Sequence, residues 1–401
     1  MNSSFLRIAL VLGLLSAVGP FAIDMYLPAL PSIGKDMGAS TGAVQASLMA
    51  YFVAMGAGQL IYGPVSDMVG RRPPLYFGLT LFALGSVGCA MAPDVQTLVV
   101  LRFVQGLGAC ATVVIPRAIV RDLYTGHDAA RVMALLMLVF SVSPILAPLS
   151  GALVVQASGW RAVFWIIAVL AIAAIVLVAT SLRETRAPEQ LSGSGLRSAL
   201  RSYGVLLRDR QFLGLVAVGA FGVSSFFVYL ANSPFVLIDH FGLTSRQYGV
   251  AFAINAASFI GFSQLTGRLG RRLGLALLVR RAMVGYAVAM SMLLLFNLLG
   301  VDQMWLMLVL LFVGYGFLGL VMPSTAVLAL DRHGPIAGTA SALMGMFQFV
   351  TGALVMAIVG MFVDGSSRPM VIGIGVCALT ALVISFRTLS TAPVTGDAVK
   401  F

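Results

Sequence analysis

The feature that most constrains this sequence is a series of apolar runs, each about 20 residues long, that covers most of the chain. A helix needs about 20 apolar residues to cross the roughly 30 Å hydrocarbon core of a bilayer. A strand of a membrane barrel needs only about 10 residues, with alternating polarity. The runs therefore predict membrane-spanning helices. Twelve spans are expected, at residues 6–30, 42–64, 74–92, 95–118, 132–156, 161–182, 211–238, 247–266, 279–299, 303–329, 336–362 and 369–387.

The composition excludes most other kinds of protein. Hydrophobic residues make up 60% of the 401 residues and charged residues only 10%, too few to cover the surface of a soluble fold. Cys89, Cys110 and Cys377 all lie within apolar runs and form neither a disulfide framework nor a metal-ligand spacing. Because the sequence also lacks a phosphate-binding loop, a nucleophile elbow and a zinc motif, we expect no enzyme activity, no cofactor and no metal.

The positive charges predict the orientation in the membrane. Most of the 25 Lys and Arg residues lie in loops on one side of the predicted spans, and only Lys35, Arg161, Arg246 and Arg368 lie on the other. Cytoplasmic loops carry an excess of Lys and Arg. We therefore expect a multi-pass protein of a bacterial inner membrane with both termini in the cytoplasm. The net charge of +11 is then explained by contact with membrane lipid and requires no nucleic-acid partner.

Repeated motifs divide the chain into two halves. The triplet Gly-Arg-Arg at residues 70–72 recurs at residues 270–272, after the second and the eighth predicted span. We expect an all-α membrane protein of two pseudo-symmetric six-helix bundles, with an N-terminal bundle at 1–186, a cytoplasmic linker at 187–210 and a C-terminal bundle at 211–401. Two parallel repeats with a binding site between them are typical of transporters.

Two charges lie inside the predicted spans of the first bundle. Asp24 is expected roughly 9 Å below the outer face in span 1, and Arg102 roughly 10 Å below the same face in span 4. Ionisable groups in hydrocarbon are costly, so each is a candidate functional residue. We predict that the two groups meet, that Asp24 carries a proton in competition with substrate, and that Arg102 tunes it. The alternative is a fixed ion pair that only holds helices 1 and 4 together.

The loop after span 2, GPVSDMVGRRP at residues 63–73, resembles the signature loop of the major facilitator superfamily. The resemblance implies a latch on the cytoplasmic side. In that latch Asp67 would dock near the start of span 11, around Pro335, and Arg71 would pair with Asp122. Glycines in such a loop permit a tight turn and close approach of helices. The matching residues are Gly63, Asp67, Gly70, Arg71 and Arg72.

Two further motifs are similar to those of the same superfamily. LRFVQGLGA in span 4 matches a motif associated with proton coupling, through Arg102, Gln105, Gly106 and Gly108. SPILAPLSGALV in span 5 resembles the antiporter motif through Pro144, Pro148 and Gly151, with Ser150 where a second glycine is usual. Small residues and prolines allow close packing and bending between helices.

Three segments together resemble the bicyclomycin/chloramphenicol-resistance (Bcr/CflA) branch of drug:proton antiporters. They are DMYLPALPSI in span 1, RAIVRDLY after span 4 and GWRAVF at the start of span 6. This resemblance implies export of drugs or small metabolites, driven by inward proton flow.

The substrate cavity is expected between the bundles. Phe227 of span 7 stands at the repeat position of Asp24, so the second half contributes apolar and aromatic lining where the first contributes charge. Such a cavity suits a moderately lipophilic small molecule with one polar or cationic group. The predicted lining residues are Tyr26, Gln105, Phe226, Phe227, Tyr229, Asn232, Tyr315 and Gln348.

The sequence therefore favours a proton-coupled efflux antiporter that works by alternating access, with a small molecule and protons as its ligands. Because the proposed site needs only one chain, we expect a monomer. A proton symporter that takes up a nutrient is the first alternative, and the antiporter motif argues against it. A non-transporting receptor or structural protein is the second, and the charges within the spans argue against that.

Overall fold

The computed structural model describes residues 3–124, 126–185 and 196–389. The regular structure in these ranges is helical. The middle of the predicted linker, residues 186–195, lies outside the described residues. The helices are α1 (Ser3–Asp24), η1 (Leu27–Ala29), α2 (Leu30–Met37), α3 (Thr41–Val69), α4 (Arg72–Met91), α5 (Val95–Leu123), α6 (Gly126–Ser158), α7 (Trp160–Ser181), α9 (Leu196–Leu206), α10 (Arg210–Pro234), η2 (Phe235–His240), α11 (Ser245–Gln264), α12 (Thr266–Leu273), α13 (Leu275–Leu298), α14 (Met304–Asp331), η3 (Gly334–Ile336), α15 (Ala337–Gly360) and α16 (Arg368–Leu389).

The predicted membrane spans are present as helices. Within the described residues, 10 helices are long and apolar enough to cross a bilayer, and the pair α11 and α12, bent by 42°, makes an eleventh. The remaining predicted span corresponds to α6, whose described apolar stretch is Val142–Ser158. The expected fold class is confirmed.

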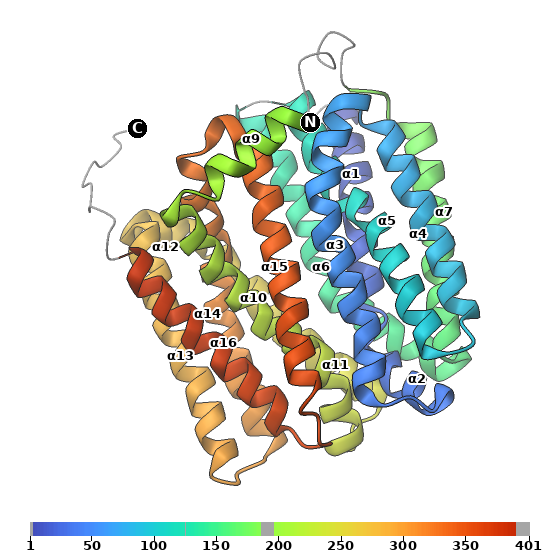
Figure 1. The fold of residues 1–401 in the computed structure, drawn as a ribbon, viewed down its shortest axis with the longest axis vertical. Helices are drawn as coiled ribbons and strands as arrows, with labels where there is room; N and C mark the ends of the chain where they lie inside the picture. Colours follow the sequence, from blue (N-terminus) through green and yellow to red (C-terminus); the bar gives the residue numbers. More distant parts are fainter. Residues whose placement is uncertain (1–2, 125, 186–195, 390–401) are drawn as a thin grey trace.

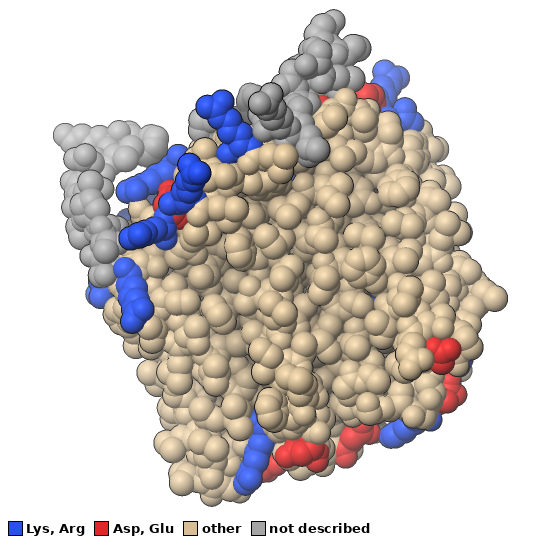
Figure 2. All heavy atoms as spheres, viewed as in Figure 1, with Lys and Arg blue, Asp and Glu red and all other residues tan. Residues whose placement is uncertain are grey.

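The helices gather in two groups. In Figure 1, α1 to α7 lie on one side of the molecule, α10 to α16 lie on the other, and α3 lies beside α15 at the seam. Figure 2 shows Lys and Arg mainly at the end that carries α9 and α12, acidic residues mainly at the opposite end, and an uncharged band between them. Following the predicted orientation, we call the end with α9 and α12 the inner end and the opposite end the outer end.

Side-chain caps define where several spans begin. Ser40 accepts a hydrogen bond from the backbone N–H of Ala43 at the start of α3, and Thr244 and Gln247 form a reciprocal capping box at the start of α11. Such caps satisfy the N–H groups that a helix leaves unpaired in its first turn. The two caps occupy corresponding places in the two halves, so the internal repeat extends to the helix ends.

Two glycines of the span 4 motif set how closely α5 packs. A Cβ at Gly106 would lie 2.5 Å from the backbone oxygen of Tyr51 in α3, and a Cβ at Gly108 would lie 2.4 Å from the backbone of Gly78 in α4. No side chain fits at such distances. The motif therefore lets α5 contact two neighbouring helices directly, and this contact fixes the place of Arg102 one to two turns away.

Candidate functional site

The first membrane span is interrupted near its outer end. α1 ends at Asp24, and the 3-10 helix η1 separates it from α2. Pro28 and Pro31 lie in this region, and proline has no N–H to continue the helical hydrogen bonds. The side chain of Asp24 is buried, with only 5% of its surface exposed. The carboxyl predicted from the sequence thus stands at the C-terminus of a helix, where the helix dipole disfavours a negative charge.

The seventh span is interrupted at the corresponding place. α10 passes at Pro234 into the π-helix η2. The side-chain amide of Gln45, from α3, donates to the backbone oxygen of Ala231 (3.1 Å) and to Oδ1 of Asn232 (2.9 Å). A buried side chain of the first bundle therefore binds the broken helix of the second.

An ion pair adds to this contact at the outer surface. Nζ of Lys35, in α2, lies 3.1 Å from Oδ1 of Asp239, in η2. Both side chains are exposed, so the pair contributes little stability by itself. Together with Gln45 it marks the outer side as the place where the two broken spans are joined.

Arg102 is completely buried. Its Nη1 donates to Oε1 of Gln105 at 2.5 Å, and Gln105 in turn donates to the hydroxyl of Ser86. The guanidinium lies 4.4 Å from the ring centre of Tyr26 and 4.3 Å from that of Tyr51. The negative faces of aromatic rings attract a cation, so these rings stabilise a charge that would otherwise be costly in this environment.

The predicted contact between Asp24 and Arg102 is not formed. Within the described residues no ion pair of 4.0 Å or less joins them, and Nε and Nη2 of Arg102 have no hydrogen-bond partner there. Asp24 instead lies within electrostatic reach of the hydroxyl groups of Tyr51 and of Tyr248, which belongs to the second bundle. The predicted equal depth of the two groups stays a prediction, and aromatic rings occupy the faces of the Arg102 guanidinium. The alternative of a fixed ion pair between helices 1 and 4 is excluded for this conformation by the same observation.

The antiporter motif packs against the break in span 1. A Cβ at Gly151 of α6 would lie 2.2 Å from the backbone oxygen of Met25, the residue after Asp24. Pro148, one turn away, contacts the second bundle: a Cβ at Gly249 of α11 would lie 3.3 Å from its backbone oxygen. Both Pro148 and Pro144 lie inside α6. The close packing predicted for this motif is confirmed, and it occurs directly beside Asp24.

The predicted cavity residues do not line one common cavity in this conformation. Phe226, Tyr229 and Tyr315 belong to a cluster of aromatic rings inside the second bundle, with Phe252 and Phe259. Tyr26, Gln105, Tyr229 and Tyr315 are fully buried by their neighbours, and Asn232 is almost so. The pattern of aromatic residues indicated the right helices, but ring–ring packing encloses the side chains.

One of the predicted lining residues, Phe227, lies at the seam between the bundles, and another, Gln348, lies against α10 within the second bundle. The ring of Phe227 stacks on that of Phe349, with 5.6 Å between ring centres, and its centre lies 4.3 Å from that of Phe52 in the first bundle. Gln348 is partly exposed on α15, with its amide nitrogen 3.6 Å from the position a Cβ would take at Gly219 of α10. Of the two residues, only Phe227 has a described contact with a residue of the first bundle.

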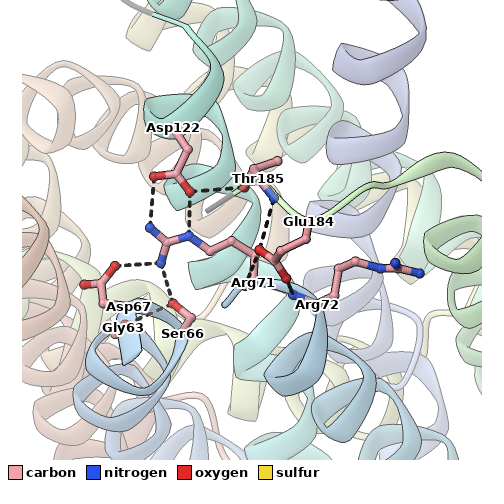
Figure 3. Close-up of polar contacts among 8 residues, drawn as sticks. All are labelled: Gly63, Ser66, Asp67, Arg71, Arg72, Asp122, Glu184 and Thr185. Atoms are coloured by element: carbon pink, nitrogen blue, oxygen red, sulfur yellow. Dashed lines mark hydrogen bonds and ion pairs between the residues drawn. The ribbon is translucent and has the colours of Figure 1, made fainter. Parts of the chain in front are cut away.

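The signature loop is built around Arg71 (Figure 3). Its guanidinium donates to both carboxylate oxygens of Asp122 (2.7 and 3.0 Å), to Asp67 (2.7 Å) and to Ser66 (2.8 Å). Only 2% of Arg71 is exposed. Burial alone would lower the pKa of Arg71, but the Asp122 and Asp67 carboxylates raise it above its usual value. The expected contact between Arg71 and Asp122 is therefore present.

Glu184, which follows α7, was not predicted from the sequence as a functional residue. Its carboxylate accepts hydrogen bonds from the backbone N–H groups of Arg71 (2.9 Å) and Arg72 (3.0 Å), at the start of α4. Gly70 turns the chain there with φ +93°, and a Cβ on it would lie 2.8 Å from Glu184. The next residue, Thr185, donates to Asp122. Two features of the sequence could have identified it: an acid directly after a span that ends on the same side as the Gly-Arg-Arg turn, and a helix that begins at that turn, since a helix N-terminus attracts an acid.

Other predicted latch residues differ in their positions. Gly63 lies inside α3, not in a turn, and a Cβ on it would meet nothing within 4 Å, so the expectation of a tight turn or close approach is wrong there. Arg72 donates to the hydroxyl of Tyr76. The predicted docking of Asp67 around Pro335 stays a prediction, because the side chain of Pro335 lies outside the described residues. At the start of α15 it is the guanidinium of Arg121 that lies against Gly338.

Two bundles of helices, broken first spans in each and a buried carboxyl at their junction define a membrane transporter of the alternating-access type. The comparison with protein families agrees with this class. Residues 12–356 match the family described as Major Facilitator Superfamily, and the chain belongs to that superfamily.

Curated relatives cover most of the chain. An uncharacterized transporter of this superfamily, YdgK of Bacillus subtilis, is 37% identical over 88% of this chain and 89% of its own length. The bicyclomycin resistance protein homolog of Haemophilus influenzae is 30% identical over 95% of both chains. Multidrug resistance protein MdtL of Shigella flexneri is 33% identical over 61% of both. The resemblance to the drug-resistance branch is thus confirmed.

Solved structures share the fold. A D-xylose–proton symporter superimposes with a TM-score of 0.76 over 96% of this chain and 97% of its own, at 16% identity. A bacterial homolog of the human lysosomal transporter Spinster, in an inward-facing conformation, superimposes with a TM-score of 0.75 over 97% of this chain and 98% of its own, also at 16% identity.

Proposed function

We propose that this protein is a proton-coupled efflux antiporter that exports drugs or small amphipathic molecules by alternating access. The relatives named for bicyclomycin and multidrug resistance support the direction and the class of substrate. Bicyclomycin is accordingly the first compound to test. The observation that carries the proposal is the position of Asp24, a buried carboxyl at the break of span 1, next to Met25, against whose backbone the antiporter motif packs.

The mechanism uses Asp24 as the proton carrier. With no guanidinium in contact and a helix C-terminus around it, this carboxyl is best accommodated in its neutral form in the present arrangement. Separation of the outer ends of the bundles breaks the contacts of Gln45 and Lys35 and admits water to Asp24, which then exchanges its proton. Arg102 acts as a fixed positive charge behind Tyr51, so that it favours ionisation of Asp24 only once water or substrate reaches the site.

The second bundle supplies the apolar side of the substrate site. Phe227 lies at the seam, Gln348 lies on α15 against α10, and Phe226, Tyr229 and Tyr315 form an aromatic cluster within the same bundle. Opening of the seam would present Phe227 and, after rearrangement, the cluster to a lipophilic ligand. Arg71, Asp67 and Asp122 would serve as the latch on the inner side, with Glu184 bound to the backbone of the turn at Arg71 and Arg72.

The cellular setting follows from the charge distribution. We place the protein in a bacterial inner membrane with both termini in the cytoplasm, because the end with α9 and α12 carries most of the basic residues. Substrate and protons are the expected ligands, lipid is the surrounding solvent, and one chain is sufficient to form the site.

Transport direction is the test that separates export from uptake. In inverted membrane vesicles energised by proton pumping, an antiporter accumulates bicyclomycin and related test compounds, and addition of the compound discharges part of the pH gradient. The matched control is Asp331→Asn, which removes an exposed carboxylate without a described partner, and it should behave as the wild type. Accumulation only in right-side-out vesicles would favour the proton symporter instead.

A further inference from the structure

The two Gly-Arg-Arg turns of the repeat lie in opposite electrostatic environments. In the first half, Arg71 is buried among Asp67 and Asp122, and Glu184 binds the backbone of the turn. In the second half, Arg271 and Arg272 are exposed on α12. The position of Asp67 is occupied there by Gly267. The same motif therefore keeps its guanidiniums in the second half but has no acid at the position of Asp67.

The guanidiniums of the second turn belong to a larger unneutralised group. Arg268, Arg271 and Arg272 lie on α12, and Arg280 and Arg281 follow in the first turns of α13. The sequence contains no Asp or Glu between residues 240 and 301. α14 also packs on α12 and ends at Asp331, yet among the described residues no ion pair links an acid to any of these five. Like charges this close repel one another, so the group favours an external anion.

The position of this basic group matches the membrane surface. Figure 2 shows Lys and Arg gathered over the corner of the molecule where Figure 1 places α9, α12 and the inner end of α16. α12 is bent by 42° from α11, and it buries Thr266 while Arg268, Arg271 and Arg272 stay exposed. A short amphipathic helix with arginines on its polar face is typical of the headgroup region.

An apolar track begins beside these guanidiniums. Arg281 lies on one exposed face of α13, and the following turns of that face are apolar and exposed. Spacings of three and four residues align them along the helix, toward the outer end. A phospholipid whose phosphate lies at Arg281 would thus have its acyl chains beside this track. The residues of the track are Val284, Val288, Met292 and Leu295.

We propose that α12 and the start of α13 form a binding site for the headgroup of an anionic phospholipid of the inner leaflet. The guanidiniums of Arg271 and Arg272, with those of Arg268, Arg280 and Arg281, bind the phosphate, and the exposed face of α13 contacts the acyl chains. Basic pockets between membrane helices on the cytoplasmic side suit such headgroups. The ligand supplies the negative charge that Asp67 supplies at this turn in the first half.

Native mass spectrometry of the purified full-length protein in detergent tests this site. The protein is titrated with dioleoyl-phosphatidylglycerol, with dioleoyl-phosphatidylcholine and with glycerol 1-phosphate. We expect wild type to bind phosphatidylglycerol most tightly. The double variant R271Q/R272Q should weaken that affinity roughly 30-fold, since two basic side chains at the anionic surface are lost. Its melting temperature without added lipid should match wild type, because both side chains are exposed.

The control variant R246Q/R368Q removes the same charge from the outer end and should keep the wild-type affinity. Equal weakening in both variants would overturn the proposal, since binding would then depend on net charge alone. Unchanged phosphatidylglycerol affinity in R271Q/R272Q would also overturn it. If glycerol 1-phosphate bound as tightly as the lipid, the site would belong to a soluble anion and the lipid assignment would be wrong.

Discussion

At the scale of single residues, the structure replaces a predicted ion pair with two separate environments. Hydropathy and the rise of a helix gave the depth of Asp24 and of Arg102, but depth does not determine which way a side chain points. Successive residues turn by about 100° around a helix, so one sequence leaves the direction open. Tyr26 and Tyr51 flank the guanidinium, whereas Asp24 forms no ion pair with it among the described residues. Whether two residues of equal depth touch depends on how the helices pack, for example α5 on α3, and the sequence does not specify that packing.

Replacement of Arg102 by lysine tests the aromatic environment. Arg102→Lys keeps the charge, but a compact ammonium cannot face both rings and bind Gln105 at once. A desolvated cation–π contact contributes about 2 kcal/mol, so we expect a clearly lower melting temperature and slower transport. Arg161→Lys is the matched control, because Arg161 lies over the ring of Trp160 but is exposed. Equal melting temperatures for wild type and Arg102→Lys would show that the rings do not stabilise the guanidinium.

Asp209 predicts a pH dependence of stability. Partial burial opposes its ionisation, but hydrogen bonds from the backbone N–H groups of Phe212 and Gln211, and from His333, hold the pKa of Asp209 below its usual 3.8. A carboxyl whose pKa is lower in the folded state stabilises the protein above its unfolded-state pKa, and this contribution is lost as the pH falls through the folded-state value. Asp209→Asn should therefore lower the melting temperature at pH 7, and this difference should shrink as the pH falls below the unfolded-state pKa of 3.8. A constant difference between variant and wild type across this range would contradict the assignment.

At the scale of helices, most of the spans could be predicted but their interruptions could not. Mean hydropathy stays high over residues 7–37 and 210–240, so each apolar run reads as one helix through the break. The prolines were visible signals, although Pro20, Pro64 and Pro116 lie inside unbroken helices of the same protein. Glu184 was missed because its partners, the N–H groups of Arg71 and Arg72, are far away in the sequence and belong to the backbone. Contacts of that kind leave little trace in residue types.

Two glycine substitutions in the recognised motifs should have opposite effects. Gly151→Ala places a Cβ 2.2 Å from the backbone oxygen of Met25, so α6 must move away from the break in span 1, at a cost of about 1–3 kcal/mol. Gly63→Ala adds a Cβ in open space within α3 and should stabilise the helix by about 0.5–1 kcal/mol. Melting temperatures of the two variants in the same detergent measure both effects. If Gly63→Ala destabilised the protein as much as Gly151→Ala, the open space described at Gly63 on α3 would be wrong.

At the scale of the whole molecule, the two halves have the same arrangement of helices but carry different functional residues. Each begins with a broken span, and each has a capped second span and a Gly-Arg-Arg turn. The first half holds the carboxyl, the buried guanidinium and the acidic latch, whereas the second holds aromatic clusters and an unneutralised basic surface. The repeat, the charge asymmetry and the unequal halves were all readable from the sequence. The seam between the halves was not, because it depends on contacts such as Gln45 with Asn232.

Movement of the two bundles can be tested at the outer end. Lys35 and Asp239 are exposed and in contact across the seam, and the described native cysteines are buried. In K35C/D239C, a short bifunctional thiol reagent should therefore join α2 to η2 and stop transport, and reduction of a disulfide-linked reagent should restore it. The single variant K35C, treated in the same way, should keep transporting. Full activity of the cross-linked double variant would mean that the outer ends do not separate.

The most direct measurement of the central claim compares wild type and Asp24→Asn in proteoliposomes, with a compound that the vesicle assay shows to be transported. Wild type should move this compound against its gradient when a pH difference is imposed. Asp24→Asn should fold, and should still exchange labelled for unlabelled compound at equal pH, but should give no uptake in response to the pH difference. Undiminished pH-driven transport by Asp24→Asn would contradict the account, because the proton would then travel by another group.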